Sequence, residues 1–160
     1  MEKTLLIGYG NLDRQDDGVA WHILMALLKR FDYSLPSHPD DEIFEIESNP
    51  AFMFLLQLTP ELAEDIAGYE RVCFIDAHTS AIPEELHVAE VSPIFQNSPF
   101  THHITPQTCI SLASTLYDVT PEALLVSIRG YEFDFSRQLS QQTQALVSQA
   151  VQTIWEWATR

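Results

Sequence analysis

The sequence has few basic residues, and this scarcity narrows the range of partners that it can bind. Eight Lys and Arg residues stand against 23 Asp and Glu residues in a chain of 160, a formal net charge of −15. Phosphate backbones and anionic membrane surfaces repel such a chain, so we expect neither nucleic acid nor a membrane as partner. A bound cation or a basic partner fits this charge better. Acidic residues spread along a chain also serve solubility, which is the simpler explanation for most of them.

Cysteine is scarce as well, and long apolar runs are absent. Cys73 and Cys109 are the only cysteines; they lie in apolar runs without a CxxC spacing, so we expect free, buried thiols in a reducing compartment. Sequence separation alone leaves a disulfide between them open. No apolar run approaches the roughly 18 residues of a membrane span. The start of the chain, where Glu2-Lys3 leads directly into a short apolar run, does not resemble a signal peptide. We expect a cytoplasmic protein.

Strand and helix patterns alternate along the chain and predict a single α/β domain over residues 1–160. Continuous apolar runs, typical of parallel strands buried on both faces, predict strands at 3–9, 71–76 and 123–129. Alternation of polar and apolar residues predicts edge strands at 42–47 and 85–91, the second of them antiparallel. Helical spacing and helix-start signals predict helices at 17–31, 50–67, 106–117 and 140–159.

This order of elements predicts a three-layer α/β/α fold with a mostly parallel, twisted sheet of about five strands, one edge strand antiparallel. The edge character of 42–47 places it outside the first strand, which makes 3–9 and 71–76 neighbours. Ligands of such sheets bind beyond the carboxyl ends of the strands, where the strand order reverses. Asp17 after the first strand and Asp76 at the end of the other should therefore flank one crevice.

Glycine is missing where a nucleotide site would need it. The turn Gly8-Tyr9-Gly10-Asn11 has two glycines but lacks the third of a dinucleotide-binding motif. Asp16 and Asp17 place negative charge where backbone N–H groups would otherwise face a phosphate. The turn therefore favours a cation. Each acid also has a structural explanation, such as a favourable charge at a helix N-terminus for Asp17 or a turn cap for Asp76.

The pair His102-His103, just before Pro106, is the third component of the predicted site. Two carboxylates and one imidazole suit a divalent transition metal and leave coordination positions open. Without cysteine ligands the set does not resemble a structural zinc site. A pair of histidines in a loop is also common by chance. A cysteine hydrolase that uses Cys109 with His102 is a weaker alternative, because Cys109 falls inside a predicted helix.

Three further polar residues are assigned to the substrate side of the crevice: Asn11, Asp16 and Arg129. Asn11 could polarise a carbonyl group, or it could simply adopt a left-handed turn conformation. Arg129 ends the strand 123–129 and is the only cation that the expected topology places near this face. A salt bridge to one of the many acids is its plainer role.

At these residues the chain resembles the hydrogenase maturation proteases, which trim the C-terminus of the large subunit of nickel–iron hydrogenases. The resemblance covers nearly the whole length. It is most specific at Ile7-Gly8-Tyr9-Gly10-Asn11 followed by Asp16-Asp17-Gly18, and at Phe74-Ile75-Asp76-Ala77. One departure is Glu47-Ser48-Asn49-Pro50, where many members have an Asp-Gly-Gly loop, and it puts substrate contacts there in question.

The resemblance implies that Asp17, Asp76 and either His102 or His103 contact nickel, with Asp17, Asp76 and His102 as the catalytic set. The nickel is expected to arrive bound to the hydrogenase large-subunit precursor, and no organic cofactor is expected. Hydrolysis of one peptide bond follows, by a water that either the metal or a carboxylate activates. We expect a monomer. The alternative function is a non-catalytic module of the same fold that binds a metal or a nucleotide.

Overall fold

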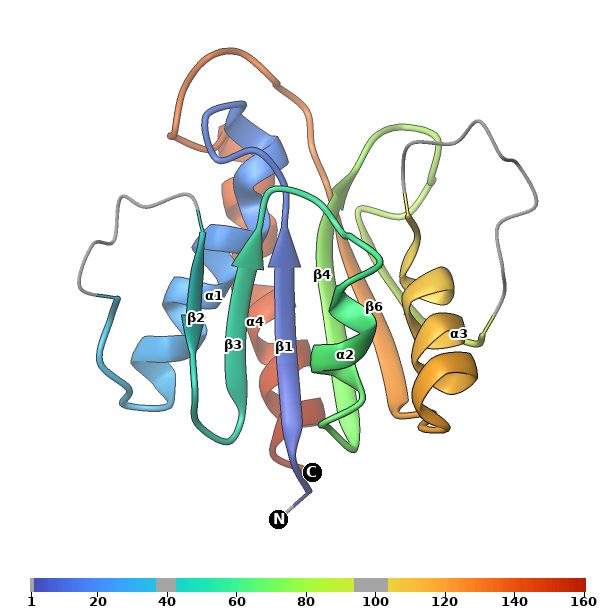
Figure 1. The fold of residues 1–160 in the computed structure, drawn as a ribbon. Helices are drawn as coiled ribbons and strands as arrows, with labels where there is room; N and C mark the ends of the chain where they lie inside the picture. The colour runs from blue at the N-terminus through green and yellow to red at the C-terminus, as the bar shows by residue number, and fades with distance from the viewer. Residues whose placement is uncertain (1, 37–42, 94–103) are drawn as a thin grey trace.

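The computed structural model describes residues 2–36, 43–93 and 104–160 and has three layers, with a sheet between two layers of helices (Figure 1). Six strands lie in the order β2-β3-β1-β4-β6-β5. Their bounds are β1 Thr4–Tyr9, β2 Phe44–Ile46, β3 Ala51–Leu55, β4 Arg71–His78, β5 Leu86–Glu90 and β6 Glu122–Arg129. The four central strands β3, β1, β4 and β6 are parallel, and β2 and β5 are antiparallel at the two edges. The predicted fold class is confirmed.

In the described part of the chain, four α-helices and one short 3-10 helix cover the sheet. The bounds are η1 Gln15–Gly18, α1 Val19–Arg30, α2 Leu62–Ile66, α3 Pro106–Tyr117 and α4 Gln141–Ala158. Helices α1 and α4 lie together on one face, while α2 and α3 cover the other (Figure 1). The side chain of Thr105 caps α3 by accepting from the Thr108 N–H at 3.2 Å, with Pro106 at the first helical position, as the sequence predicts.

One predicted element is wrong, and it changes the strand order. Residues 50–67 were expected to be helical, with a fresh turn that starts at Thr59-Pro60-Glu61. Instead 51–55 form β3, while α2 at 62–66 follows the expected fresh turn. The run Ala-Phe-Met-Phe-Leu of β3 is apolar throughout, and periodicity does not separate such a short run from a buried helix. As a result β3 lies between β2 and β1, and the sheet has six strands rather than about five. The predicted neighbours β1 and β4 are nevertheless paired.

Both faces of the sheet are packed with apolar side chains, which is why β1 and β4 have continuous apolar runs. Leu6 of β1 and Ile75 of β4 face α1 and α4, whereas Ile7 and Phe74 face α2 and α3. Cys73 and Cys109 are buried, free thiols, as predicted, one in each apolar layer. Among the described residues, no helix combines the length and apolar character that crossing a bilayer requires.

Candidate functional site

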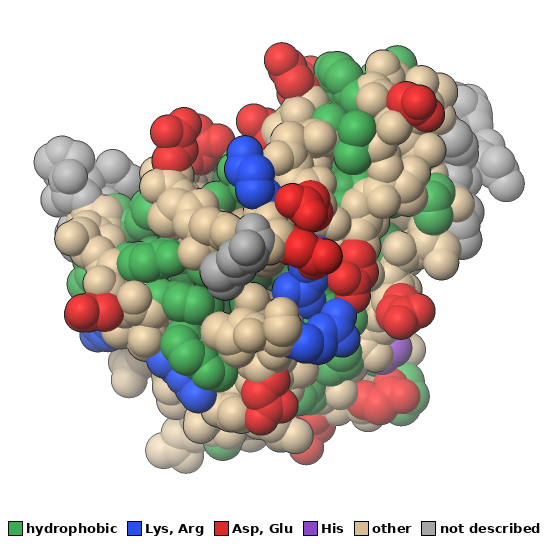
Figure 2. Space-filling view, turned by 90° about the horizontal axis from the view of Figure 1, so that it is seen from below, with side chains coloured by type: hydrophobic (Ala, Val, Ile, Leu, Met, Phe, Trp, Pro, Cys, Tyr) green, Lys and Arg blue, Asp and Glu red, His purple; other side chains and the backbone are tan. Residues whose placement is uncertain are grey.

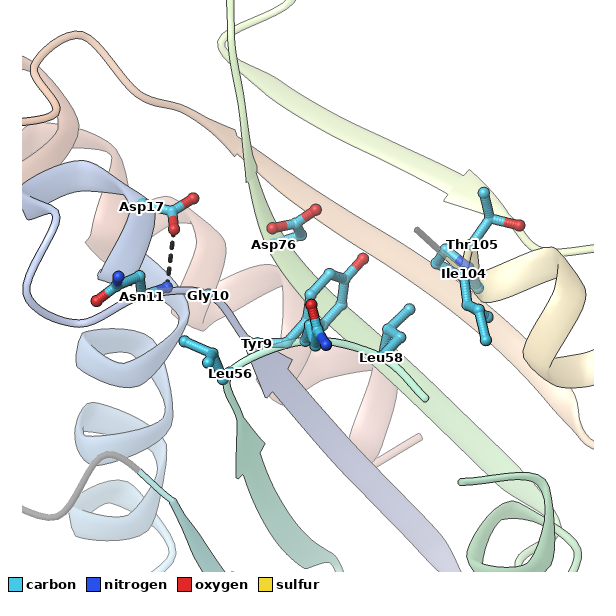
Figure 3. Close-up of a pocket in the computed structure, with 11 residues that line it drawn as sticks. Tyr9, Gly10, Asn11, Asp17, Leu56, Leu58, Asp76, Ile104 and Thr105 are labelled. Carbon is cyan, nitrogen blue, oxygen red and sulfur yellow. Dashed lines mark hydrogen bonds between the residues drawn. The ribbon is translucent and has the colours of Figure 1, made fainter. Parts of the chain in front are cut away.

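A pocket of about 470 Å³ opens beyond the carboxyl ends of β1 and β4 (Figure 3). Three separate stretches of chain meet there, namely the end of β1 with the turn that follows it, the end of β4, and the residues that lead into α3. The segment after β3 closes one side. The lining residues are Tyr9, Gly10, Asn11, Asp17, Leu56, Gln57, Leu58, Asp76, Ile104, Thr105 and Pro106. This is the position that the predicted pairing of β1 with β4 assigns to a ligand.

The turn after β1 brings Asp17 to the pocket. Gly10 has a φ of 143°, and a Cβ there would lie 2.1 Å from the backbone oxygen of Asp17, so only glycine fits. The close approach lets the Asn11 N–H donate to Oδ2 of Asp17 at 2.8 Å. A phosphate bound at this turn would need that same N–H group. The local geometry therefore argues against the nucleotide-binding alternative.

Asp76 is the second carboxylate of the pocket, and its ionisation is shifted strongly. Burial raises its pKa to about 7; the Ala77 N–H, which donates to Oδ1 at 2.7 Å, and the Tyr9 hydroxyl partly oppose this shift. The negative charge of Asp17 adds to the rise. The two carboxylates thus lie close enough to repel each other, and both point into the pocket in Figure 3. A cation between them would relieve this repulsion.

Tyr9 is a site residue that the sequence analysis missed. Its side chain lines the pocket, and its hydroxyl lies near enough to the carboxylate of Asp76 for each group to shift the pKa of the other. Burial raises the pKa of Tyr9, and the neighbouring charge of Asp76 raises it further, so the phenol stays protonated. The pairing register of β1 and β4 explains why Tyr9 belongs to the site. Gly8 pairs with Ile75 in the parallel ladder, so the next residues along, Tyr9 and Asp76, lie side by side.

Asp16 does not face the pocket, which corrects its predicted role in substrate binding. Its side chain is fully buried and accepts hydrogen bonds from the backbone N–H groups of Tyr131, Glu132 and Ser140 and from the Ser140 hydroxyl, at 2.7–2.9 Å. Burial alone would raise the pKa of Asp16, but the hydrogen bonds, that of the Ser140 hydroxyl foremost, lower it. Asp16 therefore holds the segment between β6 and α4 in place.

The other predicted residues divide between the pocket and its surroundings. Asn11 lines the pocket, while its side-chain oxygen accepts from the Asp13 N–H at 3.0 Å, as in a turn. Arg129 is not part of the pocket lining; its guanidinium lies 4.6 Å from the ring centroid of Tyr131. Its predicted contact with substrate at this pocket therefore has no support in the geometry.

The predicted histidine ligands His102 and His103 lie outside the described residues. Ile104, where the description resumes, lines the pocket. Within residues 2–36, 43–93 and 104–160 no three His, Cys, Asp or Glu side chains are grouped closely enough to hold a metal ion. The described part of the site is thus a pair of carboxylates.

Comparison with solved structures shows which known proteins share this fold. No protein-family model matches the sequence, and no curated protein does. The nickel–iron hydrogenase maturation protease HybD of Thermococcus kodakarensis is 20% identical, with a TM-score of 0.63 over 98% of this chain and 99% of that one. The hydrogenase maturating endopeptidase HybD of E. coli is 18% identical, with a TM-score of 0.61 over 95% and 89%. A hydrogenase 2 maturation peptidase of a Thaumarchaeota archaeon is 21% identical, with a TM-score of 0.61 over 97% of each chain. This protein therefore has the fold of the solved hydrogenase maturation proteases.

Proposed function

We propose that this protein is an endopeptidase that removes the C-terminal extension from the nickel-loaded large-subunit precursor of a nickel–iron hydrogenase. The observation that carries the proposal is the meeting of Asp17 and Asp76 in one open pocket at the carboxyl edge of the sheet. The fold that it shares with solved maturation proteases supports the same conclusion. The proposal includes action in the cytoplasm, as a monomer and without an organic cofactor.

Recognition of the metal rests on charge. Asp17 and Asp76 raise each other's free energy when both are ionised, and a divalent cation brought by the substrate removes this repulsion. The Asn11 N–H and the Ala77 N–H hold the two carboxylates in place, so little reorganisation is needed when the metal arrives. His102 or His103 supplies the third ligand in this proposal, since Ile104, the next described residue along the chain, lines the same pocket.

The chemical step is hydrolysis of a single peptide bond. A water oxygen adds to the carbonyl carbon, the C–N bond breaks, and a proton passes to the leaving amine. Asp76 can accept the proton of the attacking water, since its pKa of about 7 matches neutral conditions. The metal of the substrate is the alternative activator of that water. Leu56 and Leu58 offer an apolar wall for side chains of the tail on the other side of the pocket.

The test is the mass of the precursor. Purified protein is mixed with purified large-subunit precursor, loaded with nickel or free of it, and both products are weighed by mass spectrometry. We expect the nickel-loaded precursor alone to lose a C-terminal fragment. Asp17→Asn, Asp76→Asn and His102→Ala should each abolish this loss while circular dichroism shows a folded chain. Binding without any change of mass would instead identify a non-catalytic metal-binding module.

A further inference from the structure

We infer that the loop 131–139, between β6 and α4, is the surface on which the folded body of the protein substrate docks, with Phe135 as its anchor. This inference rests on the proposed function and adds to it a second contact, separate from the metal and the cleaved tail. Figure 1 shows the segment, in orange, at the same end of the molecule as the carboxyl ends of the central strands.

Phe135 is unusual in its exposure. Its side chain is 88% exposed, the highest value among the large apolar side chains that the structure describes. Phe133 of the same loop packs closely over Gly130, where an added Cβ would lie 2.5 Å from its ring. The loop thus packs one of its two phenylalanines, the half-buried Phe133, against Gly130 and presents the other to solvent. Large aromatic side chains that become buried on binding commonly supply most of the affinity of a protein interface.

The backbone that carries Phe135 is fixed on both sides. The Gln15 N–H donates to the carbonyl oxygen of Ser136 at 2.8 Å, and the Ser136 N–H donates to that of Asp13 at 3.0 Å. Arg137 pairs with the carboxylate of Asp13 at 2.7 Å, and Asp16 holds both ends of the loop through buried hydrogen bonds. A loop held in this way loses little conformational entropy when a partner binds, which favours affinity.

The same short stretch of chain joins this loop to the pocket. Asp13, Gln15 and Asp16 hold the loop, and the next residue, Asp17, lines the pocket. A substrate that rests on Phe135 is therefore held at a fixed position relative to Asp17. A pocket of about 470 Å³ has room for a short tail but not for a folded subunit. The body of the substrate must rest on the rim, and the loop forms part of it.

The chemistry of the loop indicates what the partner presents. Phe135 needs an apolar socket, and Glu132 and Asp134 are exposed beside it. Together with the net charge of −15, these acids favour a socket bordered by Lys or Arg side chains. The partner surface is therefore an apolar pocket with a basic rim on the substrate protein.

Steady-state processing of nickel-loaded precursor by Phe135→Ala tests the inference. We expect KM to rise at least about tenfold, equal to roughly 1.4 kcal/mol, with kcat within about twofold of the wild type. Phe135→Trp should restore the wild-type KM. Leu116→Ala is the matched control, because Leu116 is 62% exposed near the far end of α3, and it should change neither constant.

The outcomes separate the inference from the proposed function. An unchanged KM in Phe135→Ala, with an active wild type, would overturn the docking surface and leave the peptidase intact. An equal rise of KM in Leu116→Ala would overturn it as well, since the effect would not be specific to the loop. A wild type that leaves the precursor uncut would overturn the proposed function and the inference with it.

Discussion

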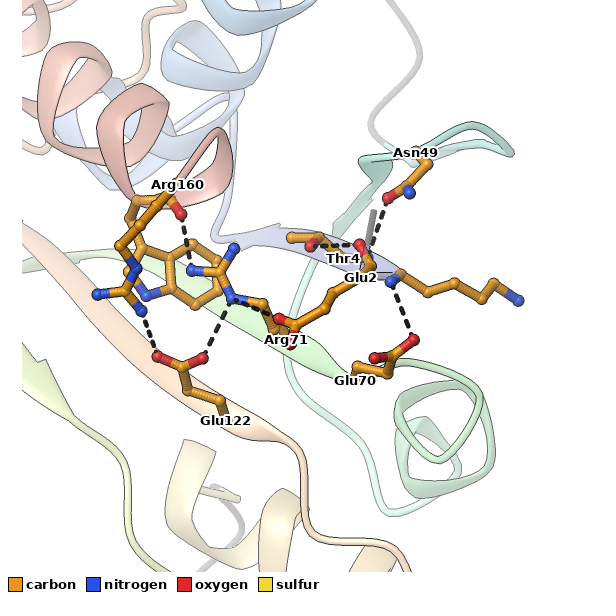
Figure 4. A network of polar contacts seen from close by, with 9 residues as sticks. Glu2, Thr4, Asn49, Glu70, Arg71, Glu122 and Arg160 are labelled. Atoms are coloured by element: carbon orange, nitrogen blue, oxygen red, sulfur yellow. Dashed lines mark hydrogen bonds and ion pairs between the residues drawn. The ribbon is translucent and has the colours of Figure 1, made fainter.

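Strand β4 has a charged residue near each end, Arg71 and Asp76, and the two side chains have opposite kinds of neighbours. At its amino end the buried guanidinium of Arg71 donates to the backbone oxygen of Trp157 at 2.6 Å and pairs with Glu122 at 3.2 Å (Figure 4). Glu2 lies 3.6 Å from it, and the Trp157 ring lies 3.9 Å from it. Figure 2, which looks onto this end of the molecule, shows Lys and Arg side chains among acidic ones.

At the carboxyl end of β4, Asp76 faces another carboxylate instead of a cation. Among residues 2–36, 43–93 and 104–160, no Lys or Arg forms a salt bridge with Asp76 or Asp17. Burial raises the pKa of Asp76, and the neighbouring charge of Asp17 adds to the rise. Arg71 at the amino end of β4 is thus matched by opposite charge and stabilises the fold, while Asp76 and Asp17 beyond its carboxyl end have no salt bridge to Lys or Arg in the described part of the chain. A carboxyl group with a strongly shifted pKa in an open pocket is typical of a functional site.

The largest loss of stability is expected for Asp16→Ala. Asp16 is next to Asp17 in the sequence, yet it is fully buried and accepts hydrogen bonds from three residues, so its removal leaves buried donors without partners. We expect a loss of about 3 kcal/mol in the free energy of unfolding, measured by urea denaturation. Asp17→Ala, the matched control, should lose less than about 1 kcal/mol. Equal losses in the two variants would contradict the separate roles of these neighbours.

Arg71→Leu tests the matched end of β4 and should have the next largest effect. The Trp157 carbonyl loses its donor, whereas Glu2 and Glu122, whose side chains are 62% and 51% exposed, return to water at little cost. We expect a loss of about 2 kcal/mol in the free energy of unfolding. Precursor processing, measured below the unfolding temperature, should keep the wild-type rate. A loss of processing in the folded variant would show that this end also serves function.

Asp76→Asn should stabilise the fold, in contrast to Arg71→Leu. The folded protein raises the pKa of Asp76 to about 7, above the value of about 3.9 in an unfolded chain. The folded state therefore holds a proton that the unfolded state loses, and wild-type stability falls as pH rises from about 4 to 7. The variant should avoid this fall. We expect its free energy of unfolding to exceed that of the wild type by about 1–2 kcal/mol at pH 8, a value reduced because water in the open pocket screens the charge. At pH 4, where Asp76 is protonated in the folded wild type, we expect no difference. Thermal unfolding at both pH values measures this difference. A variant that is less stable than the wild type at pH 8 would contradict the claim that ionised Asp76 destabilises the folded protein.

Tyr9→Phe should produce the smallest effect. The hydroxyl of Tyr9 lowers the pKa of Asp76, so its loss should move the acidic limb of the processing rate to higher pH. Stability should change by less than about 1 kcal/mol, since the substitution removes one polar group and leaves the ring in place. A pH profile of processing from 5 to 9, compared with Tyr33→Phe as control, measures the shift. A profile identical to that of the wild type would remove Tyr9 from the site.

The sequence predicts the side-by-side placement of β1 and β4, because both have apolar runs typical of buried parallel strands and because the edge character of residues 42–47 places that segment outside β1. That pairing, together with the turn at Gly10, brings Asp17 and Asp76 to one pocket. The strand at 51–55 could not be predicted, since five apolar residues fit a buried helix as well as a buried strand.

The sequence did not allow us to predict the direction in which the side chains of Asp16, Asp17 and Arg129 point. Asp16 and Asp17 are adjacent and chemically identical, but the 3-10 helix η1 turns the first toward the loop 131–139 and the second toward the pocket. Only the folded position of the Tyr131 and Glu132 N–H groups separates them. Arg129 was placed near the site by strand position alone, whereas its side chain lies against the ring of Tyr131.

The most direct test of the central claim compares the rates at which Asp17→Asn, Asp76→Asn and the double variant process nickel-loaded precursor. If both carboxylates engage one metal ion as a unit, each single change should lower the rate at least about a hundredfold, and the double variant should be little slower than either. Wild-type rates in either single variant, with the chain folded, would contradict the claim.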